Sequence, residues 1–309
     1  MTPSKPANRS FKTFKFLLKA GVSAGLLGLL LYRTDLFTIK QLFNSLHWTI
    51  WLTGVLLYLL AQILSAQRWR YLAHTLGFTG DFPHFLAMYF TGMFANLFLP
   101  SSIGGDAIRV LLLARRFGDA RGIISVLLDR GIGMFAMLFL ASFFSLMPSV
   151  RLSALLQPFL WLSTGSLLLA MICFPLIFNH LAKRWPGLTA YLAPILTLYT
   201  SKTAWFWCIL TSTVIQLLGF SIGLLAAFNI QIPLTFSQVA VALSLVTLLS
   251  LLPISLNGLG LREGGLIYLL GLWGIPKEHA LTIGLFLFGV QCICSLMGGF
   301  FYVFALKDR

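Results

Sequence analysis

Two charged side chains follow a helix break in the apolar stretch "NLFLPSSIGGDAIRVLLLARR", residues 96–116. Pro100 removes a backbone donor and ends the preceding helix, and the glycine pair that follows permits sharp turns. Asp106 then stands where the N-cap of a new helix is expected. Arg109 comes three residues later and can share a face with Asp106. The stretch therefore predicts a half-helix that begins beside a carboxylate and a guanidinium.

Such a half-helix can bind an anion. Its N-terminus carries free N–H groups and a partial positive charge, and an arginine one turn away adds a forked donor suited to phosphate or carboxylate. In the alternative interpretation, Asp106 only caps the helix and Arg109 extends to the cytoplasmic interface. For Arg109 alone, the two interpretations stay open.

A second stretch, "LPISLNGLGLR" at 252–262, aligns without a gap with "LPSSIGGDAIR" at 99–109. The identical pairs are Leu99–Leu252, Pro100–Pro253, Ser102–Ser255, Gly105–Gly258 and Arg109–Arg262. The offset of 153 residues is about half the chain, and paired Gly/Pro interruptions in two halves point to a transporter site between inverted repeats. Chance similarity in a leucine-rich chain is the alternative.

Asp129 and Arg130 lie inside a third apolar stretch, "LLDRGIGMF". Adjacent helical residues do not face each other, so each needs another partner, and we expect Arg109 to pair with Asp129. An ionisable residue at membrane depth is a functional-site hypothesis by default. A structural ion pair that ties this span to the first hairpin is an equal alternative.

The elements that carry these residues are membrane spans. Of the 309 residues, 58% are hydrophobic and 10% are charged, against about 25% charged in soluble domains. Apolar blocks of about 20 residues can cross the bilayer as helices. The net charge of +14 fits basic loops that set topology and attract anionic lipid, and we expect no nucleic-acid partner. The apolar segments are 16–32, 48–66, 86–99, 122–147, 155–178, 203–228, 236–252 and 281–306.

The segments 86–99 and 236–252 are short, and each ends at a proline followed by glycines. If both crossed the bilayer, the arginine loop after Arg109 would lie outside, against the positive-inside rule. If both are re-entrant hairpins, sixteen Lys and Arg, including Arg68 and Arg70 in a predicted loop, lie inside. The sequence therefore predicts an all-α integral membrane protein with six spans and two re-entrant hairpins in inverted repeats.

We expect one membrane domain, 1–309, with a basic cytoplasmic arm at 1–15, a first half at 16–147 and a second half at 155–306. The N-terminal segment has no small-residue cleavage site, so we interpret it as a retained span. Both termini are then cytoplasmic, in the cell (plasma or inner) membrane. The tryptophans near segment ends are typical of an interfacial belt; they are Trp48, Trp51, Trp69, Trp185, Trp205, Trp207 and Trp273.

No catalytic motif is recognisable. The sequence holds no HExxH, GxSxG or Walker pattern, and its cysteines and histidines lack metal-ligand spacing. We therefore predict no catalytic residues, metal or cofactor. Membrane enzymes could still use the carboxylates of Asp106, Asp129 or Glu263 for acid/base work.

The three quoted motifs, with "LPISLNGLGLREGG" for the second stretch, resemble the flippase-like family that includes the transmembrane region of lysylphosphatidylglycerol synthases. The resemblance covers about residues 15–305 and implies handling of polar lipids, with translocation between leaflets as the leading proposal. In the best-known members a soluble aminoacyl-transfer domain follows. This chain stops at Arg309 after its last span, so synthase activity is not carried over. The motif positions are Asn96, Pro100, Gly104, Gly105, Asp106, Arg109, Asp129, Arg130, Pro253, Gly258, Gly260, Arg262 and Glu263.

The first hypothesis is therefore a lipid flippase-like protein that binds or moves an anionic, phosphate-bearing head group. The alternatives are a membrane-embedded lipid or glycolipid transferase and a non-catalytic subunit. The expected partners are a membrane phospholipid or lipid-linked head group, a separate soluble transferase and a second copy of the chain. The predicted substrate-binding residues are Asn96, Gly104, Gly105, Asp106, Arg109, Asp129, Arg130, Asn257, Gly258, Arg262 and Glu263.

Overall fold

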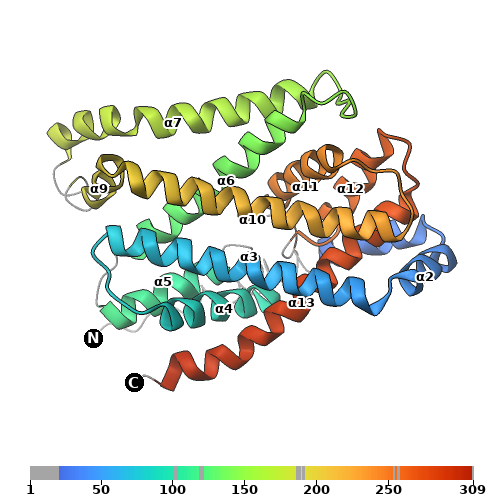
Figure 1. Ribbon diagram of the computed structural model, residues 1–309, viewed down its shortest axis with the longest axis horizontal. Helices are drawn as coiled ribbons and strands as arrows, with labels where there is room; N and C mark the ends of the chain where they lie inside the picture. The colour runs from blue at the N-terminus through green and yellow to red at the C-terminus, as the bar shows by residue number, and fades with distance from the viewer. Residues whose placement is uncertain are drawn as a thin grey trace.

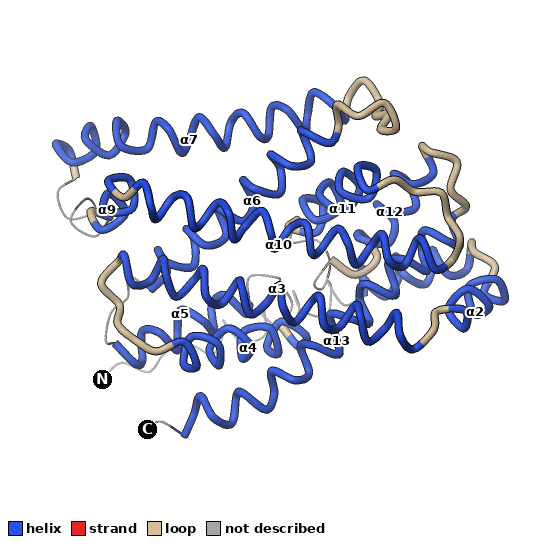
Figure 2. Tube along the Cα trace, viewed as in Figure 1, coloured by secondary structure: helices blue, strands red, loops and turns tan. Residues whose placement is uncertain are grey.

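A computed structural model describes residues 21–99, 104–117, 122–185, 189, 192–252, 255 and 258–307, and helix is the only regular secondary structure among them (Figure 2). The helices are α2 (Leu36–Ser45), α3 (Trp48–Thr75), α4 (Phe82–Phe98), α5 (Gly104–Phe117), α6 (Gly122–Phe144), α7 (Leu156–Arg184), α9 (Pro194–Thr200), α10 (Lys202–Asn229), α11 (Phe236–Ser250), α12 (Leu261–Gly271) and α13 (Lys277–Lys307). A further helix covers Gly21–Tyr32.

Five helices within the described residues are long and apolar enough to cross a membrane: α3, α6, α7, α10 and α13. The predicted first span, 16–32, ends where the helix Gly21–Tyr32 ends, and this helix meets α2 at an angle of 94°. Asp35 caps α2 at this bend by accepting a hydrogen bond from Phe37 N at 3.0 Å. The described residues thus form a multi-pass, all-α membrane protein with five candidate spans, or six if the bent pair crosses as one.

The helix α3 is longer than the predicted span 48–66. It continues to Thr75 because no glycine or proline interrupts "AQRWRYLAHT", and Gly77, with a φ of +89°, follows its end. The prediction that Arg68 lies in a loop is therefore wrong, because Arg68 lies inside α3, a candidate span.

Two helix pairs occupy the predicted hairpins. The helices α4 and α5 pack against each other on either side of the first break, and α11 and α12 do so around the second. In Figure 1, the first pair lies in the left half of the molecule and the second pair in the right half. Pro100 and Pro253 lie outside the described residues.

The helices of the two halves correspond at the 153-residue offset. The series α3, α4, α5, α6 matches α10, α11, α12, α13 in order. Contacts correspond too: α4 packs on α13 as α11 packs on α6, and α3 packs on α6 as α10 packs on α13. The central helices α3 and α10 contact each other and run in opposite directions (Figure 1). This paired arrangement supports an internal repeat.

Candidate functional site

A buried carboxylate lies at the centre of the site. Asp129, on α6, is 2% exposed and receives an arginine on each oxygen. Arg68 Nε lies 2.9 Å from its Oδ1, and Arg109 Nη2 lies 2.9 Å from its Oδ2. The expected Asp129–Arg109 pair is therefore present, and it joins α6 to α5 of the first hairpin.

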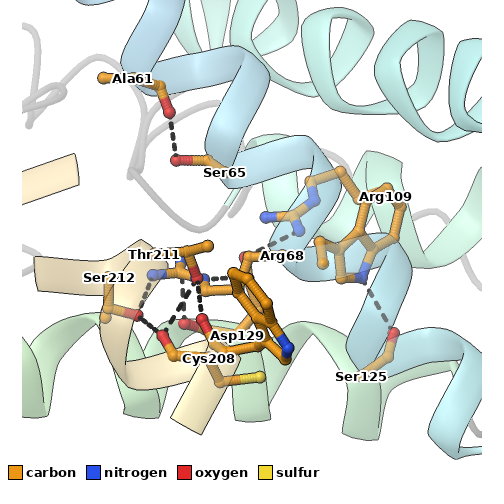
Figure 3. A network of polar contacts seen from close by, with 12 residues as sticks. Ala61, Ser65, Arg68, Arg109, Ser125, Asp129, Cys208, Thr211 and Ser212 are labelled. Carbon is orange, nitrogen blue, oxygen red and sulfur yellow. Dashed lines mark hydrogen bonds and ion pairs between the residues drawn. The ribbon is translucent and has the colours of Figure 1, made fainter. Parts of the chain in front are cut away.

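Arg68 is the residue that the sequence analysis missed. Its Nη2 also donates to the backbone oxygen of Asp129 at 3.2 Å, and its Nη1 donates to Ser212 Oγ at 2.7 Å. Figure 3 shows Arg68 between Asp129 and Ser212, so one side chain ties α3 to both α6 and α10. Extending the helical pattern beyond residue 66 would have placed this arginine at membrane depth.

Aromatic rings enclose Arg109. Its guanidinium carbon lies 4.1 Å from the Trp69 ring centroid and 4.4 Å from that of Tyr89, a range in which cation–π attraction acts. Arg109 is 5% exposed, which argues against the alternative in which it extends to the interface. Trp69 is fully buried and donates to Ser125 Oγ at 3.1 Å, so its assignment to an interfacial belt is wrong.

A second, more accessible ion pair extends the network. Arg130 Nε lies 2.5 Å from Asp106 Oδ2, and Asp106 Oδ1 lies 3.3 Å from Arg109 Nη1. The side chains of Arg130 and Asp106 are 41% and 14% exposed, against 3% for Asp129. The network therefore has a buried inner part, in which Arg68 and Arg109 bind Asp129, and a more exposed outer pair, Arg130 and Asp106.

The remaining predicted residues of the first hairpin, Asn96, Gly104 and Gly105, lie where α4 and α5 contact each other. Asn96 Oδ1 accepts a hydrogen bond from Gly105 N at 2.6 Å, which satisfies a free donor of the α5 N-terminus. A Cβ on Gly105 would collide with the carbonyl oxygen of Gly92, and one on Gly104 would lie 2.6 Å from Leu99 Cβ. These glycines let α4 and α5 approach closely.

The second hairpin has its own ion pair. Arg262 Nη2 lies 2.7 Å from Glu263 Oε1, and Arg262 Nη1 donates to Gln291 Oε1 at 3.2 Å. The fully buried Glu263 also accepts from Gly260 N at 2.7 Å, which caps α12. Gly258 has a φ of +78°, and Asn257 lies outside the described residues. Arg262 and Glu263 thus pair with each other, on α12 of the second half.

Both clusters border cavities that adjoin. The first cavity, of about 380 Å³, is lined by the five charged residues around Asp129 and by side chains of α10, α11 and α13. The second, of about 180 Å³, is lined by Arg262. The side chains common to both cavities are Tyr58, Met137, Gln216, Thr247 and Gln291. The charged residues of the two halves thus face adjoining spaces.

Formal charge in the first cavity is positive. Its charged lining residues are three arginines and two aspartates, so one net positive charge remains after pairing. Across the described part of the chain, no group of three or more His, Cys, Asp or Glu side chains could hold a metal ion. The chemistry available there is recognition of an anion by guanidinium groups.

The fold and the site define a multi-pass helical membrane protein with a polar, positively charged internal cavity. Residues 16–299 match the family described as the lysylphosphatidylglycerol synthase TM region, and the chain belongs to that family. It is therefore a membrane protein of lipid metabolism or transport. The search of the curated proteins found no match.

Proposed function

We propose that the protein binds the anionic, phosphate-bearing head group of a membrane lipid in its internal cavity and moves it between the leaflets. The observation that carries this proposal is the net positive charge of a cavity of about 380 Å³ to which both halves of the chain contribute. Charges at membrane depth usually face a bundle interior or a substrate pathway, and the family name points to lipid chemistry.

In this proposal the helix pairs α4–α5 and α11–α12 are re-entrant hairpins that enter from opposite faces. Broken backbone at membrane depth is tolerated where it is buried in protein or lines a cavity. The ends of α3, α5 and α13 and the start of α10 lie at one end of Figure 1. Their basic residues, including Arg70, Arg115 and Lys202, favour a cytoplasmic location for that end, with both termini in the cytoplasm.

The outer ion pair is the proposed contact for the head group. Arg68 and Arg109 are held by Asp129, and Arg109 is further enclosed by two rings. Arg130 is the more exposed guanidinium, and its Nε pairs with the outer aspartate. A phosphate can replace Asp106 as the partner of Arg130, while the lipid tails stay in the bilayer.

The test is lipid movement by the purified protein in vesicles of phosphatidylcholine with fluorescent phosphatidylglycerol, read by a membrane-impermeant quencher. Arg130→Gln removes a charge-assisted hydrogen bond worth about 1.5–3 kcal/mol, so we expect head-group binding to weaken on the order of tenfold or more, and movement to slow. Arg115→Gln, at the exposed end of α5, is the matched control. Wild-type movement by Arg130→Gln would contradict the proposed site.

A further inference from the structure

The two cavities adjoin at a set of five side chains that come from five different helices. Tyr58 lies on α3, Met137 on α6, Gln216 on α10, Thr247 on α11 and Gln291 on α13. We call this set the waist. The helices α4, α5 and α12 contribute no side chain to the waist.

The waist is polar but carries no formal charge. Gln216 Nε2 donates to the backbone oxygen of Gly133 at 3.1 Å, and Thr247 Oγ1 donates to that of Leu243 at 2.7 Å. Gln291 Oε1 accepts from Arg262 at 3.2 Å. An arginine lines each of the two cavities that meet at the waist: Arg130 lines the first and Arg262 lines the second.

We propose that the waist is the passage through which the head group moves from the first cavity to the second, and that its width and its neutral hydrogen-bonding groups control the rate of movement. This inference rests on the proposed function. Amide and hydroxyl groups can replace part of the hydration of a phosphate, and they release it more readily than a fixed guanidinium would. Passage through a pore requires binding that is favourable enough to enter and weak enough to leave.

Thr247 is the position at which the waist can be tested. Its side chain is exposed to the cavity, so Thr247→Trp adds bulk where there is open space. Thr53→Trp is the matched control. Thr53 is also exposed on a spanning helix, and its hydroxyl donates to Thr49 O at 2.8 Å, but it lines neither cavity.

The measurement compares movement of fluorescent phosphatidylglycerol in vesicles with phosphatidylglycerol binding by native mass spectrometry. We expect Thr247→Trp to move lipid at least tenfold more slowly than the wild type while it still binds phosphatidylglycerol. Thr53→Trp should match the wild type in both measurements. If Thr247→Trp moves lipid at the wild-type rate, the inference that the waist is the passage is wrong, and the proposed function is unaffected. If the wild type moves no lipid, both the proposed function and the inference about the waist are wrong.

A second variant avoids any folding defect of the tryptophan. Thr247→Cys is a small change, and a benzyl methanethiosulfonate reagent can be attached after the folded protein is in vesicles. We expect the reagent to stop lipid movement and a reductant to restore it. The wild type, with its four native cysteines, is treated identically. Movement by reagent-treated Thr247→Cys that equals that of the treated wild type overturns the inference.

Discussion

At the scale of single residues, the site depends on one carboxylate that compensates two buried arginines. Asp129 accepts from Arg68 on one oxygen and from Arg109 on the other. Both arginines are less than 10% exposed. A buried charge is tolerated only with such partners, so Asp129 has a structural role whatever ligand the cavity binds.

We therefore expect Asp129→Ala to lower the stability of the protein by about 3–5 kcal/mol, the usual effect of removing one partner of a buried ion pair. The measurement is the thermal unfolding midpoint in detergent. Asp106→Asn, in the more exposed pair, serves as the control and should change the midpoint much less. Equal midpoints for Asp129→Ala and the wild type would contradict the structural role.

For Asp106, the aspartate of the outer pair, we predict a substitution that strengthens lipid binding. Asp106 competes with an incoming phosphate for Arg130, so Asp106→Asn should bind phosphatidylglycerol more tightly than the wild type does. Movement should not accelerate, because release becomes slower. Native mass spectrometry of phosphatidylglycerol titrations measures the affinity, and weaker binding by Asp106→Asn would argue that Asp106 itself contacts the lipid.

At the scale of elements, close helix contact shapes the first hairpin. Gly105 faces Gly92 and Asn96 across the two helices, and a Cβ there would lie 2.6 Å from Asn96 Nδ2. The same contact allows Gly105 N to reach Asn96 Oδ1. The hairpin thus fixes where Asp106 and Arg109 enter the cavity.

Gly105→Ala should therefore push α4 and α5 apart, at a cost of about 1–3 kcal/mol, as is typical of overpacking. The thermal midpoint should fall, and lipid movement should slow because Asp106 shifts. Gly165→Ala on α7 is the control, since a Cβ at Gly165 meets nothing within 4 Å and Gly165 lines neither cavity, and alanine favours a helix. A midpoint for Gly105→Ala at or above that of Gly165→Ala would contradict the close contact.

At the scale of the whole molecule, two similar halves carry different chemistry. The counterparts of Asp129 and Arg130 at the repeat offset are Thr282 and Ile283. Among the described residues, the first half thus contributes five charges to the first cavity, whereas the charged residue that lines the second cavity is Arg262. The two halves share their helix order, whereas the charges of the proposed anion site come from the first half.

The proposed topology can be measured with impermeant thiol reagents on intact cells. Arg116→Cys, at the end of α5, should be labelled only after the membrane is opened. Lys277→Cys, at the start of α13, should be labelled from outside. Both positions are exposed, and the wild type measures background from the native cysteines. External labelling at residue 116 would exclude the re-entrant arrangement.

The sequence by itself determined the class of the protein and the positions of the two helix pairs α4–α5 and α11–α12, and it singled out four of the five charged residues that the structure brings together. Those features depend on short-range patterns: the length of apolar runs, the proline and glycine breaks, and charges inside apolar segments. It missed Arg68 because the apolar run ends before the helix does.

The partners of each charge were decided only by the tertiary structure. Arg68 meets Asp129 across 61 residues of sequence and Ser212 across 144, and Trp69 and Tyr89 surround Arg109 from two other helices. Helical periodicity gives the face on which a side chain lies, but not which distant helix covers that face. Packing within the first half supplies most of those neighbours, α10 of the second half supplies Ser212, and the two halves together line the adjoining cavities.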